Sequence, residues 1–261
     1  MMFKNHSLPI VLFLVLASFT GHKKSNLPKG FNDLKGFVQV PLGDLPNHDK
    51  DALYFFFENE VSNFDYAEFL YHIRANEPEN LNMVNLNSEL WLSVDADGTS
   101  EFAKNYHKLK EYPVVNLTAE AASAYCVWLQ NIWNQRGTSY DVTIRLPTKE
   151  EWEHIATQED GSEYATGNGL LKDDKNTAMA RYKALGLPFG PAPRGSFEPS
   201  LYGLNDLCGN VSEMVIHMDK VYTKGGSWDS KAIDLTVANT RDFEVGPTAG
   251  FRPVIILKER M

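Results

Sequence analysis

Cysteine is scarce in this chain, which has 261 residues and only two cysteines, Cys126 and Cys208. Two cysteines can form at most one disulfide, so a fold stapled by several disulfides is excluded. Cys126 falls on the apolar face of a predicted helix, where we expect a small buried thiol. A large hydrophobic core must therefore stabilise the fold, and a hydrophobic content of 43% is enough for one.

Positive charge is also in deficit. The chain has 25 Lys and Arg residues against 34 Asp and Glu residues, a formal net charge of -9. Its Lys and Arg residues form no run longer than a pair. Binding to a nucleic-acid backbone depends on clustered positive charge, so no nucleic-acid partner is expected.

Familiar catalytic motifs are missing as well. The seven histidines include no pair four residues apart and no His-x-His, so a zinc or iron site of usual spacing is not expected. The sequence has no Gly-x-Ser-x-Gly elbow, no Walker loop and no Gly-x-Gly-x-x-Gly. Function must therefore be sought in other patterns.

The chain has one long apolar run, from Leu8 to Ala17, preceded by Lys4 and His6. The run is short for a membrane span of about 20 residues and is typical of a secretory signal. We therefore predict a signal peptide over 1–21, a polar tether over 22–30 and one domain over 31–261, with no further transmembrane span. The protein is expected to be exported, either periplasmic or associated with the cell envelope. The cleavage motif is weak, so an uncleaved anchor remains open, but the run has no cysteine to carry a lipid.

Three helices are predicted, beginning after Ser62, Thr118 and Thr148. Each of these residues is followed by apolar positions at helical spacing. Asp65 and Glu151 lie three residues after Ser62 and Thr148, which is the spacing of a capping box. The strand signals are short, at 36–40, 53–57, 142–144 and 250–257, and 161–202 has the composition of a long ordered loop. The fold class is therefore α+β with modest regular structure.

The segment YGLNDLCGNVSEMV, residues 202–215, contains two carboxylates on either side of a turn. Asp206 and Glu213 could bind calcium together with the backbone carbonyls of Gly209 and Val211, because calcium prefers oxygen ligands. The alternative is that Asp206 caps a turn and Glu213 pairs with an arginine. Spacing alone favours that alternative.

The segment KGGSW, residues 224–228, raises a second question. Its glycines could cradle a phosphate, but no helix signal follows them, and a phosphate-binding loop normally leads into a helix. A tight turn packed against the core is the favoured interpretation.

Several motifs occur in an order that identifies a family. They are FVQVPLG (37–43), ENEVSNFDYAEFL (58–70), YPVVNLTAEAASAYCVWL (112–129), IRLPTKEEWEHIA (144–156), GSFEPSLYGLNDLCGNVSEMV (195–215), KGGSW (224–228) and GFRPV (250–254). In this order the chain resembles the formylglycine-generating enzyme family, also called the sulfatase-modifying factor domain family. The resemblance implies a single compact domain of C-type-lectin-like type with low regular secondary structure and bound calcium.

The resemblance also assigns residues. It places one family calcium site on Asp206, Gly209, Val211 and Glu213. With the resemblance, a structural calcium ion is favoured over the turn cap and arginine pair that spacing alone favoured. Active family members bind copper through two cysteines after the Gly-Gly-Ser turn, and those positions hold Ser230 and Leu235 here. A hydroxyl and an aliphatic side chain cannot replace two soft thiolates, so copper is not expected.

Some family members without these cysteines are exported proteins of gliding motility and secretion in Bacteroidetes, and the stretch 101–122 resembles theirs. The leading hypothesis is thus a non-catalytic, calcium-stabilised binding or assembly module with an envelope protein or a glycan as partner. An enzyme of different chemistry on the same scaffold stays open, with Trp228, Asp229, Arg241 and Asp242 as candidates in the former groove. So does sulfatase maturation, if other groups replace the missing cysteines. For the charged candidates, ordinary surface ion pairs are the simpler interpretation.

Overall fold

The computed structural model describes residues 36–86, 109–157, 161–166, 169–172, 178–183 and 190–260. The predicted signal peptide and tether lie outside these residues, as does the first part of the 101–122 stretch. In the part of the chain that is described, no helix is long and apolar enough to span a bilayer.

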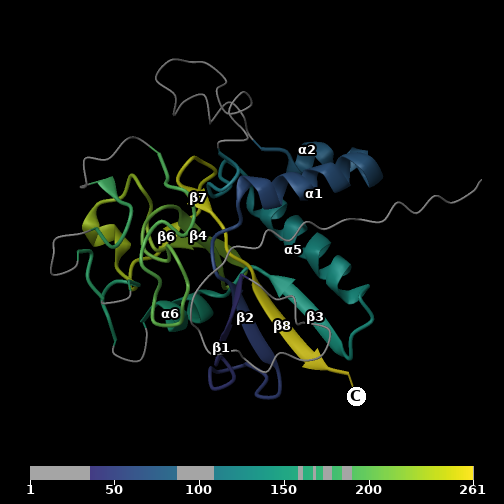
Figure 1. The fold of residues 1–261 in the computed structure, drawn as a ribbon, viewed down its shortest axis with the longest axis horizontal. Helices are drawn as coiled ribbons and strands as arrows, with labels where there is room; N and C mark the ends of the chain where they lie inside the picture. The colour runs from purple at the N-terminus through teal and green to yellow at the C-terminus, as the bar shows by residue number, and fades with distance from the viewer. Residues whose placement is uncertain are drawn as a thin grey trace, which may run out of the picture. The chain divides into compact units, whose positions relative to one another are not determined.

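Four antiparallel strands form the first sheet, in the order β1 (Phe37–Val40), β2 (Leu53–Phe57), β8 (Val254–Glu259) and β3 (Tyr140–Arg145). Figure 1 shows the yellow β8 between β2 and β3. The strands predicted at 36–40, 53–57 and 142–144 are confirmed. The predicted strand at 250–257 is divided, because its first residue ends β7 and β8 begins only at Val254.

The second sheet has the order β6 (Arg241–Asp242), β5 (Lys220–Lys224), β4 (Ser212–His217) and β7 (Ala249–Gly250). The sequence analysis did not predict β4 or β5. The first four residues of β4 are all buried, so its sequence lacks the alternation that marks a strand with one solvated face. The end of the 202–215 segment is therefore strand rather than turn.

The three predicted helices are confirmed as α1 (Asn63–Asn76), α5 (Ala119–Asn134) and α6 (Lys149–Thr157). The hydroxyls of Ser62, Thr118 and Thr148 each accept an N–H from the first turn at 3.1 Å. Shorter elements went unpredicted: α2 (Leu81–Val84) and two 3-10 turns, Pro78–Asn80 and Ala232–Leu235. Helix α5 packs against β3 and so covers the first sheet.

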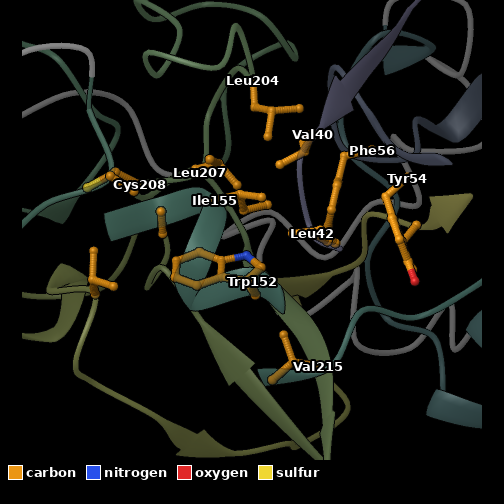
Figure 2. Close-up of a cluster of buried hydrophobic side chains, with 14 of the residues drawn as sticks. Val40, Leu42, Tyr54, Phe56, Trp152, Ile155, Leu204, Leu207, Cys208 and Val215 are labelled. Atoms are coloured by element: carbon orange, nitrogen blue, oxygen red, sulfur yellow. The ribbon is translucent and has the colours of Figure 1, made fainter. Parts of the chain in front are cut away.

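Trp152 of α6 lies in a large hydrophobic cluster and is fully buried. The cluster includes Val40 and Phe56 from the first sheet and Val215 from the second (Figure 2). Leu207, from the 202–215 segment, belongs to the same cluster. The indole therefore packs where side chains of both sheets meet the predicted site segment.

Beside Trp152, Glu151 is fully buried but well partnered. Arg145 donates to both of its carboxylate oxygens at 2.7 Å, and the Thr148 amide donates at 2.7 Å. The Nε2 atom of His48 lies 2.8 Å from Oε1. Burial alone would raise the pKa of Glu151, but the hydrogen bonds and charge of Arg145 and the bonds from Thr148 and His48 lower it below the ordinary value.

We expect Glu151→Gln to lower the free energy of unfolding by about 2 kcal/mol at neutral pH, because it leaves Arg145 without its carboxylate partner. Glu150→Gln is the matched control on the same helix, since Glu150 pairs only with His217 and is half exposed. A folded-state pKa below 4.5 means that the Glu151 contribution is present above pH 4.5 and is lost as the pH falls through the folded value. Urea titrations at pH 7 and pH 4 measure both effects, and equal losses in the two variants would contradict the prediction.

Candidate functional site

Strand β5 runs into the turn that begins with Gly225 and Gly226. Both glycines have left-handed backbones, with φ of 79° and 67°. A Cβ on Gly225 would lie 2.4 Å from the Leu207 carbonyl oxygen, and one on Gly226 would lie 3.1 Å from that of Asp234. These positions need glycine because the turn is pressed against two other segments as well as being left-handed.

Two backbone amides of this turn have hydrogen-bond partners. The Ser227 N–H donates to the Ser230 hydroxyl at 2.9 Å, and the Trp228 N–H donates to the Asn210 carbonyl at 2.8 Å. The Trp228 indole is buried and donates to the Pro247 carbonyl at 3.1 Å. These two bonds and the close contacts of both glycines favour a packing turn over a phosphate cradle.

The resemblance placed the copper-binding cysteines of active relatives at Ser230 and Leu235, and neither of these two side chains is available to bind a metal. The Ser230 Oγ accepts from the Ser227 amide and lies 3.2 Å from the Ser227 Oγ. Leu235 is fully buried in the hydrophobic cluster around Trp152. One hydroxyl and one aliphatic group do not fit copper, which takes soft thiolate or imidazole donors.

The two cysteines do not compensate for this loss. Both are buried and free, so the one disulfide that the sequence allowed is not formed. Burial raises the pKa of the Cys208 thiol to about 12 and also raises that of Cys126. Neutral buried thiols are poor nucleophiles and poor metal ligands. The expectation of a buried thiol at Cys126 is confirmed.

The candidates for the former groove have other partners. Asp229 pairs with Lys183 at 2.8 Å and Arg241 pairs with Asp234 at 2.5 Å, and in both pairs at least one side chain is well exposed. Asp242 is exposed on β6, opposite Tyr222 in the neighbouring strand. Surface pairs of this kind contribute little and do not indicate a catalytic arrangement.

Charged residues of the 202–215 segment are, by contrast, deeply buried. Glu213 accepts from Arg252 through Oε1, at 2.9 Å from Nε and 2.6 Å from Nη2. Its Oε2 accepts from the Trp152 indole at 2.8 Å. All three side chains are fully buried. The structure therefore pairs Glu213 with an arginine, the partner type considered as the alternative to calcium binding.

Asp206 is buried in a left-handed conformation, with φ of 58°. Its Oδ2 accepts the Gly195 N–H, whereas its Oδ1 has no hydrogen-bond partner. Burial raises the pKa of Asp206 to about 6, against the opposing effects of the Gly195 amide and the Arg252 charge. Asp206 is thus a carboxylate held in place with one oxygen left over.

Sequence analysis missed Glu60, which joins the same cluster and is fully buried. Its Oε1 accepts from the side-chain Nδ2 of Asn210 at 2.9 Å, and its Oε2 has no partner. Burial, followed by the nearby Asp206 charge, raises the pKa of Glu60 well above its usual range. The only sequence signal for Glu60 was its place inside the ENEVSN motif. A polar residue just before a helix cap is common, so this signal did not single out Glu60.

Calcium fits part of the proposed ligand set. Asp206 offers a free carboxylate oxygen, and no donor in the described ranges reaches the carbonyl oxygen of Gly209 or Val211. Glu213 is already engaged through both oxygens. Among the described residues, no three His, Cys, Asp or Glu side chains are grouped to hold a metal. A site here would therefore depend on carbonyl oxygens as well as carboxylates.

Comparisons with known proteins agree with this picture. Residues 24–256 match the family described as the sulfatase-modifying factor enzyme 1-like domain. The chain is 34% identical over 130 residues to a Bos taurus protein named inactive C-alpha-formylglycine-generating enzyme 2. That alignment covers 45% of this chain and 39% of the bovine protein, which is less than half of each.

Two solved structures share the fold. Treponema denticola variable protein 1 has 18% identity and a TM-score of 0.51, over 77% of this chain and 84% of that one. PvdO from Pseudomonas aeruginosa has 17% identity and a TM-score of 0.53, over 78% of this chain and 80% of that one. At this level of identity, the comparison establishes the fold alone.

We expect Gly225→Ala to destabilise the protein by about 3 kcal/mol or more. The added Cβ costs about 1 kcal/mol in a left-handed backbone and also meets the Leu207 carbonyl. Gly161→Ala is the matched control, because Gly161 has φ of 72° but nothing within 4 Å of a Cβ. Thermal or urea unfolding of both variants checks the difference, and equal losses would show that the contact with Leu207 is unimportant.

Proposed function

The chain belongs to the sulfatase-modifying factor enzyme 1-like domain family, and we propose that it is a non-catalytic member serving as a binding or assembly module. The observation that carries the proposal is the chemistry after the Gly-Gly-Ser turn. Ser230 is hydrogen-bonded to Ser227, and Leu235 is part of the hydrophobic core. Neither position offers a thiolate, and the two cysteines of the chain are buried elsewhere.

The fold is intact although the expected copper-binding cysteines are absent. This combination supports a role in binding rather than in redox chemistry. The turn that presents cysteines in active relatives is still packed through both glycines and Trp228. The bovine relative is itself named as inactive, which favours the same interpretation for the shared region. An enzyme of different chemistry on this scaffold has less support, because Asp229 and Arg241 are engaged in surface ion pairs.

The proposed setting is the cell envelope. The apolar run Leu8 to Ala17 would direct export, and an envelope protein or a glycan would be the partner. The most specific form of this proposal is a role in gliding or secretion machinery. It is based on the resemblance of the 101–122 stretch to proteins of that machinery. The acidic net charge of -9 favours a protein or neutral glycan over an anionic partner.

Calcium is the structural ion in this proposal. Asp206 would supply a carboxylate oxygen, and the carbonyls of Gly209 and Val211 would supply two more ligands. The ion would compensate buried negative charge and hold the segment before β4, and no reaction passes through it.

The non-catalytic role predicts that the purified protein will not convert the cysteine of a Cys-x-Pro-x-Arg peptide to an aldehyde with copper and oxygen. Mass spectrometry of the peptide measures the conversion, with a metal-free blank as the baseline. An active formylglycine-generating enzyme run in parallel shows that the assay works. Turnover above the blank that disappears on heat denaturation of the protein would overturn the proposal.

The calcium role predicts that EDTA will lower the melting temperature, and that excess calcium will restore it. An ion at about 100 times its dissociation constant adds about 2.7 kcal/mol, which corresponds to roughly 5–10 °C for a domain of this size. Asp206→Asn should remove the response, whereas Asp229→Asn, which alters an exposed carboxylate, should retain it. An unchanged melt in EDTA would rule calcium out.

A further inference from the structure

We propose that the outer edge of β1 binds an extended segment of a partner protein, which adds a strand to the first sheet. This inference rests on the binding role proposed above and gives that role a surface and a partner chemistry. It does not depend on calcium.

The opposite edge of the sheet, β3, is closed. β1 and β3 are the two edge strands of the first sheet (Figure 1). The Asn134 carboxamide of α5 donates to the Val142 carbonyl at 2.9 Å and accepts the Val142 N–H at 3.0 Å. Gln130, one turn earlier on α5, accepts the Ile144 N–H through Oε1 at 3.0 Å. These side chains occupy backbone groups that an added strand would need, which protects the edge.

The edge of β1 lacks such caps. The Glu58 N–H donates to the Gly36 carbonyl at 2.8 Å, which fixes the phase of the β1–β2 ladder. Hydrogen-bonded and non-hydrogen-bonded pairs alternate along an antiparallel ladder. The backbone groups of Val38 therefore point toward β2, and those of Phe37 and Gln39 point away from it. In the described ranges, β1 pairs with β2 alone, and no other hydrogen bond reaches the backbone of Phe37 or Gln39.

The side chains at this edge leave room for an added strand and offer it apolar contacts. Phe37 and Val38 are half-buried, and Gln39 is exposed. The Phe37 ring packs edge-on against Phe57, with the ring centroids 4.6 Å apart, whereas Val38 packs against the hydrophobic cluster on the other face. A Cβ on Gly36 would meet nothing within 4 Å, so the start of the edge is open. An added strand would extend both apolar layers.

β1 also lacks the sequence features that usually protect an edge. Its sequence, Phe-Val-Gln-Val, has no charged residue and no proline, and its register with β2 contains no bulge. One edge of the sheet is thus capped by side chains from α5, while the other has unpaired backbone groups and no charge. This contrast favours a bound strand at β1.

The edge selects the chemistry of the partner. Its alternating N–H donors and C=O acceptors are complementary to an extended peptide backbone, and its apolar side chains favour aliphatic residues in the added strand. A second copy pairing through β1 would contribute four residues a side, whereas a stable interface uses about 20–30. Strand addition by a peptide segment needs no such area, because backbone hydrogen bonds supply its affinity. The occupant is therefore a segment of another protein.

The probe for this surface is a short fluorescent peptide of alternating Val and Thr, N-methylated at every second residue. Methylation blocks one edge of the peptide against self-association and leaves the other edge free to pair with β1. Fluorescence anisotropy should show saturable binding to the purified protein. The same peptide N-methylated at every residue has no amide donors and should bind about tenfold more weakly.

Gln39→Pro removes an outward N–H of β1 without removing a ladder bond, because proline is tolerated where a strand N–H faces solvent. It should weaken binding of the half-methylated peptide by about tenfold. Gln39→Thr, the matched control, keeps the N–H and should bind as the wild type does. Should Gln39→Pro fail to fold, amide hydrogen exchange of the wild type replaces it. The peptide should slow exchange at Phe37 and Gln39 and leave Val142 and Ile144, on the capped edge, unchanged.

The inference is wrong if the half-methylated peptide does not bind, if both peptides bind equally, or if exchange slows elsewhere than at Phe37 and Gln39. A dimer in sedimentation that Gln39→Pro dissociates would also overturn it, because the edge would then pair with a second copy. None of these results bears on the non-catalytic role, which the Cys-x-Pro-x-Arg assay decides without reference to β1.

Discussion

The guanidinium of Arg252 holds the two sheets of this domain together. It lies between β7 and β8 and donates to Glu213 in the second sheet and to the Phe57 carbonyl, at 2.7 Å, at the end of β2. A further bond reaches the Asn205 carbonyl at 2.6 Å. The guanidinium is fully buried, so it has lost its hydration. Its desolvation free energy is offset only if all of these acceptors stay in place. The position of the 202–215 segment follows from that requirement.

The residues that pack the fold around this ion pair differ from the residues at the expected catalytic positions. The Gly225 turn and the buried Trp152 fill space against Leu207 and the hydrophobic cluster. At the two positions where the resemblance expects copper-binding cysteines, Ser230 is a hydrogen-bonded hydroxyl and Leu235 is a core residue. The proposed non-catalytic role is compatible with an intact fold, because packing and reactivity depend on different atoms.

The pairing of Arg252 with Glu213 does not neutralise the other buried carboxylates nearby. Of the three buried carboxylates that act on Arg252, only Glu213 is paired with it, and Glu60 and Asp206 each keep an unpartnered oxygen. A buried negative excess must be met by protons or by a cation. For a protein proposed to act outside the cytoplasm, a cation would couple the stability of the binding module to its ionic surroundings.

Much of this was readable from the sequence, because it depends on local rules. Ser62, Thr118 and Thr148 fix helix starts through hydrogen bonds within one turn. The residue types at 230 and 235, Ser and Leu, are likewise given by the sequence. Only the tertiary structure decided that β4 is a buried strand, that Glu213 faces Arg252, and that Glu60 joins Asp206. The last two facts depend on residues 39 and 146 positions apart, which local patterns do not encode.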